Sequence, residues 1–298
     1  MPSWILPGRE NDPVMRYKTI LETSFAYSRT FNPRNIEYYW YSLWAQTLSD
    51  LVADMSNLIV VPQFPVWFVP EDDDHEDEED GDDPEEIVRK DPDSKEMEAS
   101  PRQADGDDEE EGGGGAGNVS VAFTIPEKDA EGVIVDFAIV HLKAVAQPQP
   151  KYRIRYGGWR ITEANIGLLV EVKRFVSRSL TGQELHDRIH VRVAEATIDL
   201  VEQAAHLFIQ DENMNSVLAL AAAGPYWCSV KIYRNNVKKA MHLIRAKDPS
   251  YRPKEHPSDP KLNWNVILRV DLARSRDRLH TIYNALKEMS VLEIPAGV

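Results

Sequence analysis

The chain has 298 residues, 42% of them hydrophobic, and a single cysteine, Cys228. This length fits one large domain or two small ones, and one cysteine excludes an intramolecular disulfide. The formal net charge is −15, but residues 71–111 alone carry 23 acidic and 4 basic side chains, so the rest of the chain has a net charge of about +4. The overall acidity therefore does not exclude a polyanionic partner such as nucleic acid.

No apolar run approaches the ~20 residues that cross a bilayer. Residues 1–13 also lack the basic stretch followed by an apolar stretch that marks a secretory signal. We therefore predict no membrane association. The lone cysteine suits a reducing compartment, so the sequence predicts an intracellular protein, cytoplasmic or nuclear. It gives no indication of the oligomeric state.

A long helix is predicted over residues 33–57. Asn32 is a suitable N-cap, and Pro33 suits the first helical position. Apolar residues then recur at helical spacing, namely Ile36, Trp40, Leu43, Trp44, Leu51 and Met55. The next segment, residues 58–68, is rich in β-forming residues, and its two prolines favour an edge or irregular strand.

The segment 71–118 is predicted to be a disordered insertion. It is acidic and ends in a glycine-rich run, and it lacks the apolar residues that would offset the entropy of ordering. We expect it to recruit a basic protein partner or to mask a basic face of the folded part.

After the insertion, strands are predicted at residues 120–125, 133–142 and 167–175. Residues 151–162 alternate around Gly157 and Gly158 and favour an extra hairpin. Thr181 and Glu184 form a capping box that begins a helix with one apolar stripe, ending near Asp211. Further elements are predicted in chain order as strands at 217–223 and 227–233 and a last helix at 272–289.

Three side chains stand out as candidates for chemistry. Asp136 is the one polar residue in the run VIVDFAIV at 133–140, and a carboxylate in such a buried strand is costly unless it is paired or bound to a metal. Glu171 and Lys173 are two residues apart on a predicted strand, so they share one face. If the two strands are neighbours, the three side chains converge. Carboxylate oxygens suit a hard cation such as Mg²⁺.

Asp136, followed by Glu171-Val172-Lys173 and then a helix, resembles the PD-(D/E)XK nuclease superfamily over about residues 33–70 and 119–235. The resemblance implies a restriction-endonuclease-like core of helix, three strands, helix and strand. It also implies that Asp136 and Glu171 bind Mg²⁺ or Mn²⁺ and that Lys173 assists the nucleophile in cutting DNA or RNA. Some members add an acidic residue from the first helix, for which Glu37 is the candidate. Val135 stands where the motif has proline, and the gap between Asp136 and Glu171 is long.

The predicted fold is therefore a mixed α/β sheet with a restriction-endonuclease-like core, an extra hairpin and a C-terminal helix. Residues 1–70 supply the first helix and strand of the core, 71–118 the acidic insertion, 119–235 the remainder of the core, and 236–298 a C-terminal helical extension.

Alternative interpretations remain open. Asp136 and Lys173 could form a buried structural ion pair, in which case the chain would be a catalytically inactive module on the same fold that binds protein or nucleic acid. The basic side chains of the predicted hairpin are candidates for contacting phosphates, or are the solvated face of an ordinary hairpin; they are Lys151, Arg153, Arg155 and Arg160. His186 and His190, one helical turn apart, match half of a zinc-hydrolase motif, although no third ligand is evident.

Overall fold

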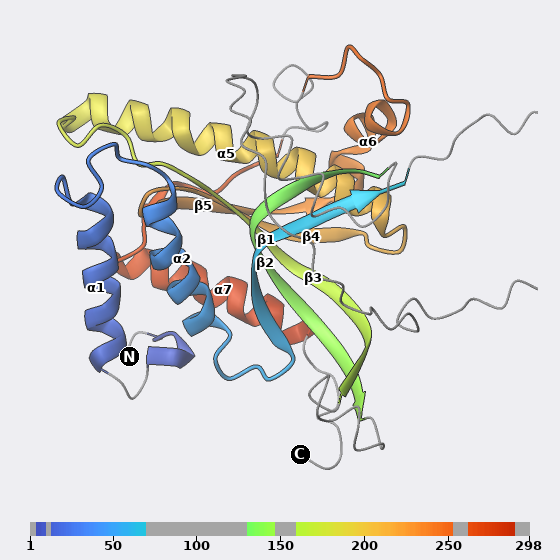
Figure 1. Ribbon diagram of the computed structural model, residues 1–298, viewed down its shortest axis with the longest axis horizontal. Helices are drawn as coiled ribbons and strands as arrows, with labels where there is room; N and C mark the ends of the chain where they lie inside the picture. Colours follow the sequence, from blue (N-terminus) through green and yellow to red (C-terminus); the bar gives the residue numbers. More distant parts are fainter. Residues whose placement is uncertain (1–3, 10–12, 70–129, 147–158, 253–261, 290–298) are drawn as a thin grey trace, which may run out of the picture.

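The computed structural model describes residues 4–9, 13–69, 130–146, 159–252 and 262–289 (Figure 1). The predicted strand at 120–125 and the acidic insertion at 71–118 lie outside these ranges, as does most of the predicted hairpin at 151–162. In the described part the chain is a mixed α/β protein with one six-stranded sheet. None of its described helices is long and apolar enough to cross a membrane.

The strands occupy the sheet in sequence order. They are β1 (Leu58–Phe68), β2 (Glu131–Ala146), β3 (Trp159–Lys173), β4 (Ser216–Ala223), β5 (Tyr226–Tyr233) and β6 (Leu268–Arg269). Neighbours pair antiparallel except β3 and β4, which are parallel and are connected through a long helix. The described α-helices are α1 (Pro13–Tyr27), α2 (Tyr38–Leu51), α5 (Gly182–Gln210), α6 (Lys238–Arg245) and α7 (Ala273–Met289).

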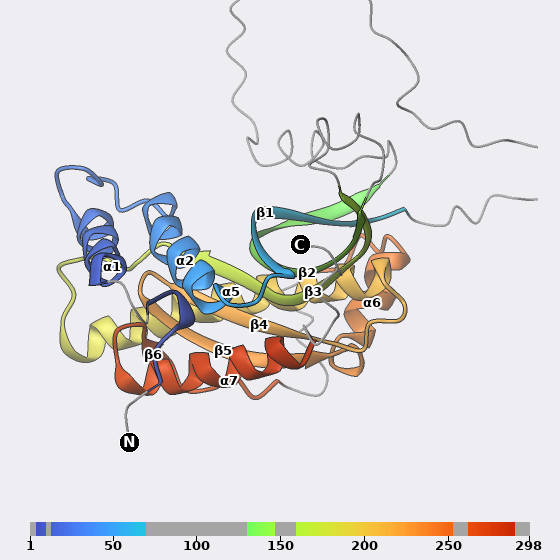
Figure 2. The ribbon, with the colours of Figure 1, turned by 90° about the horizontal axis from the view of Figure 1, so that it is seen from below.

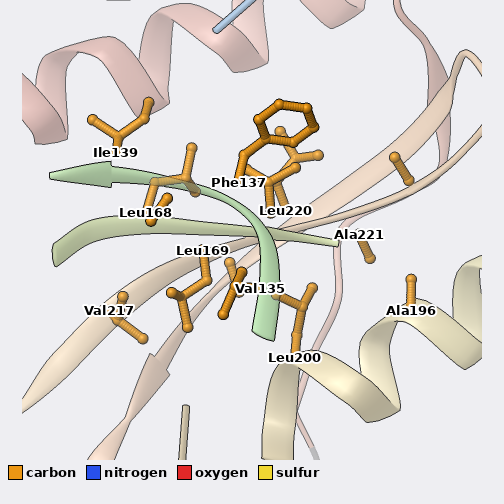
Figure 3. Close-up of a cluster of buried hydrophobic side chains, with 14 of the residues drawn as sticks. Val135, Phe137, Ile139, Leu168, Leu169, Ala196, Leu200, Val217, Leu220 and Ala221 are labelled. Atoms are coloured by element: carbon orange, nitrogen blue, oxygen red, sulfur yellow. The ribbon is translucent and has the colours of Figure 1, made fainter. Parts of the chain in front are cut away.

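Helices cover both faces of the sheet. Helix α5 lies along one face and α7 along the other, while α1 and α2 lie side by side next to the sheet (Figures 1 and 2). Figure 3 shows Val135 and Leu169 on the side that faces Leu200 of α5, and Phe137 and Leu168 on the opposite side. All five side chains are buried, because β2 and β3 are covered on both faces, as their continuous apolar runs predict.

A bulge in β3 lets α7 approach the sheet. Ile139 pairs with Leu168 and Val140 with Ile166, so Gly167 has no partner in the β2–β3 ladder. A Cβ atom on Gly167 would lie 2.7 Å from Leu286 Cδ2 of α7. A larger residue at this position would therefore require the side chain of Leu286 to shift.

Several predicted elements are confirmed. The strand 58–68 has the predicted bounds, and β1 is an edge strand of the sheet. The strands near 217–223 and 227–233, the helix that begins after Thr181 and the last helix also lie where predicted, within a few residues. The predicted capping box is not formed, because Thr181 makes no side-chain cap hydrogen bond. The coarse fold class, mixed α/β, is thus borne out.

Two predicted elements were wrong. The helix predicted over residues 33–57 is shorter, Tyr38–Leu51. It begins late because the buried Asn32 serves a turn: its Oδ1 accepts a hydrogen bond from Ile36 N at 2.9 Å, and its Nδ2 donates to Ala26 O at 2.9 Å. The described part of the predicted extra hairpin, residues 159–162, instead continues β3, and residues 159–161 pair with β2. The helices α1 and α6 were not predicted.

Candidate active site

The three candidate residues converge at one end of the β2–β3 pair. Asp136 lies on β2, and Glu171 and Lys173 lie on the neighbouring strand β3. The pairing of the two strands ends with Phe137 opposite Val170, so Asp136 and Glu171 lie just beyond the last pair. Both carboxylates are buried, at 8% and 6% exposure. The predicted neighbourhood of the two strands is therefore confirmed.

Asp136 is held by donors from three elements. Its Oδ2 accepts a hydrogen bond from the backbone N of Val172 at 2.7 Å, so the carboxylate continues the interrupted strand pairing. The hydroxyl of Tyr41, from α2, donates to Oδ1. The amide Nε2 of Gln63, from β1, lies 3.4 Å from the same oxygen. These contacts fix the orientation of the carboxylate.

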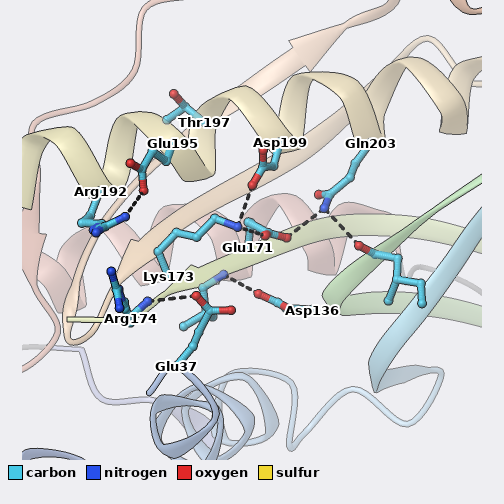
Figure 4. Close-up of polar contacts among 12 residues, drawn as sticks. Glu37, Asp136, Glu171, Lys173, Arg174, Arg192, Glu195, Thr197, Asp199 and Gln203 are labelled. Carbon is cyan, nitrogen blue, oxygen red and sulfur yellow. Dashed lines mark hydrogen bonds and ion pairs between the residues drawn. The ribbon is translucent and has the colours of Figure 1, made fainter. Parts of the chain in front are cut away.

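Glu171 and Lys173 belong to a network with α5 (Figure 4). Lys173 Nζ lies 2.6 Å from Glu171 Oε1 and 2.6 Å from Asp199 Oδ2. Gln203 Nε2 donates to Glu171 Oε2 at 2.8 Å and to Ile134 O at 3.3 Å. Helix α5 thus holds both members of the Glu-x-Lys pair through two side chains one turn apart.

Glu37, the residue that directly precedes α2, also contacts this cluster. Its Oε2 accepts a hydrogen bond from Arg174 N at 3.0 Å, directly after Lys173 (Figure 4). Burial raises the pKa of Glu37, and the charge of Lys173 opposes that shift. Glu37, the additional metal ligand predicted from the first helix, therefore lies next to the site, and one of its carboxylate oxygens accepts a backbone hydrogen bond.

Burial governs the electrostatics of the cluster. It raises the pKa of Glu171 to about 7, with the charge of Asp136 adding to the shift and Lys173 opposing it. It also raises the pKa of Asp136, against the lowering effect of the Tyr41 hydrogen bond. Burial alone would lower the pKa of Lys173, but Glu171 and Asp199 outweigh it, so this lysine keeps its proton. Because the charges of Asp136 and Glu171 repel each other, a cation placed near both carboxylates would stabilise their ionised forms.

The donor set suits a hard divalent cation. Asp136 and Glu171 offer carboxylate oxygens, and the buried Oε1 of Gln203 has no hydrogen-bond partner. Oxygen ligands of this kind are those that Mg²⁺ and Mn²⁺ take in proteins. Within the described ranges, no three His, Cys, Asp or Glu side chains form a metal-binding group. The ammonium of Lys173 lies 2.6 Å from Glu171 Oε1.

The basic residues predicted to contact nucleic acid are not at this cluster. Arg160 is exposed near the start of β3, opposite Val145, whereas Glu171 is at the far end of that strand. The other three, Lys151, Arg153 and Arg155, lie outside the described residues.

His186 and His190 are both exposed in the first turns of α5. No third His, Cys, Asp or Glu joins them in a metal-binding group in the part of the chain that is described. The zinc-hydrolase alternative, which rests on His186 and His190, therefore stays a prediction, and no third ligand supports it among the described residues.

Four residues of the site were missed from the sequence: Tyr41, Gln63, Asp199 and Gln203. Asp199 and Gln203 carried a usable signal, because they are polar residues one turn apart that flank the apolar stripe of α5 at Leu200. Tyr41 and Gln63 carried none, because their contacts with Asp136 depend on how α2 and β1 pack.

Comparison with known proteins adds no relative: no protein-family model, no curated protein and no solved structure matches this chain. The geometry of the carboxylate–lysine cluster is therefore the basis on which a function can be assigned.

Proposed function

We propose that this chain is a metal-dependent phosphodiesterase that hydrolyses DNA or RNA. In this proposal Asp136, Glu171 and Lys173 are its catalytic residues and Mg²⁺ or Mn²⁺ is its cofactor. The order of elements supports the proposal: helix α2, the antiparallel strands β1, β2 and β3, helix α5, and β4 parallel to β3. A restriction-endonuclease-like core, which the sequence motif implies, would have its elements in this order.

One observation carries the proposal. The carboxylate of Asp136 accepts a hydrogen bond from the backbone N of Val172, the residue between Glu171 and Lys173. This contact places the aspartate against the middle of the Glu-x-Lys segment, so the acidic residue of one strand and the Glu-Lys pair of the next can act on one substrate atom.

The roles follow from the contacts. Asp136 and Glu171 would hold the cation, with Gln203 orienting Glu171 through the 2.8 Å amide contact. When bound, such an ion neutralises phosphate charge and acidifies a water molecule. Lys173, kept protonated and anchored by Asp199, donates a hydrogen bond to the attacking water or to the charge that develops on the phosphate.

Cleavage assays with Mg²⁺ and Mn²⁺ on labelled DNA and RNA test the proposal. Asp136→Asn removes charge but keeps shape, so it should abolish metal-dependent cleavage. Lys173→Ala should lower cleavage but retain bound metal. The matched control is Glu163→Gln, an exposed carboxylate on the same strand that pairs with Lys143. Cleavage that survives Asp136→Asn, or its absence from the wild-type protein with every substrate and metal, would contradict the proposal.

A second candidate is a catalytically inactive binding module on the same fold. The observation in its favour is that Lys173 lies 2.6 Å from both Glu171 and Asp199, so the lysine has carboxylate partners without a metal. These partners differ from the predicted one: among the described residues Asp136 is held by Tyr41, Gln63 and the backbone N of Val172 and not by Lys173. Under this alternative, removing Lys173 leaves the buried carboxylate of Glu171 without its cation and costs ~3–5 kcal/mol of stability. Thermal melts of Lys173→Ala, read beside the cleavage assays, separate the two functions.

A further inference from the structure

A row of aromatic rings crosses the surface of α1 and α2 and ends at the proposed site. Successive rings have centroids 4.9–6.3 Å apart, in the order Phe31, Phe25, Tyr39, Tyr38, Tyr41 and Phe137. Tyr41 is the residue that donates to Asp136. We call the rings of Phe25, Phe31, Tyr38 and Tyr39, on α1, α2 and the segment between them, the aromatic face.

The aromatic face is turned to solvent. Tyr38 is 73% exposed, Phe31 64% and Phe25 46%, whereas Trp40 and Trp44 of the same helix α2 are fully buried. Ile20 and Leu21 of α1 are also about half exposed, and Leu21 lies one helical turn before Phe25. A contiguous exposed apolar patch of this kind marks an interaction site in a soluble fold.

Unpaired positive charge surrounds the aromatic face. Arg29 and Arg34 lie in the α1–α2 connector on either side of Phe31, and both are exposed. Arg174 is exposed and is brought to this end of α2 by the contact of its backbone N with Glu37. Among the described residues, none of these three guanidinium groups takes part in a hydrogen bond or an ion pair.

We infer that the aromatic face binds single-stranded nucleic acid and leads it to Asp136. This inference rests on the proposed function and names the form of its substrate. Exposed rings stack on bases that are free of a duplex, and arginines follow the phosphates. A duplex keeps its bases stacked inside, so it gains nothing from the rings. The ring row ends next to the candidate catalytic carboxylate, so a strand held on it passes the cluster.

Fluorescence anisotropy in EDTA tests the inference without cleavage. The probe is a labelled mixed-sequence DNA strand of about 20 nucleotides, longer than the ~4–16 nucleotides of typical single-strand sites, compared with its duplex. The full chain should bind the single strand more tightly than the duplex. Tyr38→Ala should weaken single-strand binding by about 5-fold or more, which is the loss of one stacked base, while Tyr38→Phe should retain it.

The control is Tyr233→Ala, which removes a half-exposed tyrosine on β5, outside the aromatic row. It should leave affinity unchanged. Replacing Arg29 and Arg34 together with Ala should reduce the slope of log K against log salt by about 0.7 for each phosphate that the protein no longer neutralises. Because these side chains are exposed, thermal melts should be close to wild type.

Three results would overturn the inference: equal affinity for duplex and single strand, unchanged single-strand binding in Tyr38→Ala, or no nucleic-acid binding together with a dimer that Phe31→Ala and Tyr38→Ala dissociate. The last result would assign the aromatic face to a second copy of the chain. Metal-dependent cleavage that is insensitive to Tyr38→Ala would overturn this inference but keep the proposed function. Single-strand binding that depends on Tyr38, in a protein that takes up no metal, would keep this inference but overturn the proposed function.

Discussion

Gln63 is held in a left-handed backbone conformation directly opposite Asp136. Its φ is 50°, and it has no partner in the β1–β2 register between Pro62 and Phe64. A non-glycine residue in this region costs of order 1–3 kcal/mol and persists where the surroundings enforce it. The distortion turns the side-chain amide of Gln63 toward Asp136.

Substitution at this position should separate backbone strain from packing. Gln63→Gly relieves the strain, so the free energy of unfolding should stay within about 1 kcal/mol of wild type or rise. Gln63→Val places a β-branched side chain in the left-handed region and should cost about 1–2 kcal/mol. Urea unfolding measures both values. A valine variant as stable as the glycine variant would show that φ at this position is not constrained.

His206 gives the fold a dependence on pH. Burial lowers the pKa of this α5 imidazole below its ordinary value of 6.5, against its contact with Glu202 O at 3.0 Å. The unfolded chain therefore binds the proton more readily, so stability is lost as pH falls below about 6.5 toward the folded-state pKa. His206→Phe should lessen the fall in stability between pH 7 and pH 5.

The matched control for this prediction is His186→Gln, an exposed histidine on the same helix. Chemical denaturation at both pH values gives the comparison. An equal loss of stability in His206→Phe and wild type would assign the acid sensitivity to other groups, among them His141, whose pKa burial also lowers.

At the residue scale, the sequence identified the site through charged residues that stand in otherwise apolar strands. Asp136 was predictable because a lone carboxylate in a buried strand requires a partner, and Glu171 because it shares a strand face with Lys173. Tyr41 was not predictable, because on α2 it is one of several tyrosines, and only packing brings its hydroxyl to Asp136. Sequence thus indicated the charged atoms of the site, and tertiary structure supplied their neutral partners.

At the scale of elements, α5 controls the lysine of the site. Asp199 shares the ammonium of Lys173 with Glu171, and its own side chain is 38% exposed. In Asp199→Asn the ammonium is left to Glu171 alone and competes more strongly with a cation. Affinity for Mn²⁺ should therefore fall several-fold, while stability should fall by no more than about 1 kcal/mol.

Glu195→Gln provides the control for this prediction, because Glu195 lies one turn earlier on α5 and pairs with Arg192 instead. Mn²⁺ titration should give it the wild-type affinity. If Asp199→Asn binds Mn²⁺ as tightly as wild type, Lys173 does not compete for the carboxylate of Glu171.

Strands were easier to predict than helix starts. The run Leu58–Phe68 was located to the residue, because its composition changes abruptly at both ends. The start of α2 was misplaced, because Asn32 and Pro33 carry the pattern of a helix cap while Asn32 in fact binds Ala26 O and Ile36 N around a turn. Local capping patterns cannot distinguish a helix start from a turn that long-range contacts stabilise.

At the scale of the whole molecule, the described strand ends on either side of residues 70–129 are neighbours. Phe68 pairs with Glu131 at the end of the β1–β2 ladder, so the chain leaves and re-enters the sheet at neighbouring positions. Deleting residues 72–116 should therefore change the melting temperature little, since each doubling of loop length costs only ~0.6 kcal/mol. A large loss of stability would show that the segment packs on the fold.

The same deletion tests the masking hypothesis. Residues 71–111 carry 23 acidic side chains, and the remainder of the chain has a net charge of about +4. If the acidic segment covers a basic face, its removal should tighten binding to single-stranded DNA at low salt, with the effect fading as salt screens the charges. Unchanged affinity at low salt would reject masking.

The most direct test of the proposed site is a Mn²⁺ titration of the wild-type chain, Asp136→Asn and Glu163→Gln, with binding measured by isothermal titration calorimetry. Asp136 and Glu171 are predicted to supply the carboxylate ligands, so the wild type and Glu163→Gln should bind the ion with the same affinity. Asp136→Asn should lose that binding while remaining folded: it relieves repulsion with Glu171 but replaces one of the two acceptor oxygens, which bind Tyr41 and the backbone N of Val172, with an NH2 group. Absence of binding by the wild type, or unchanged binding by Asp136→Asn, would contradict the assignment of this cluster as a divalent-cation site.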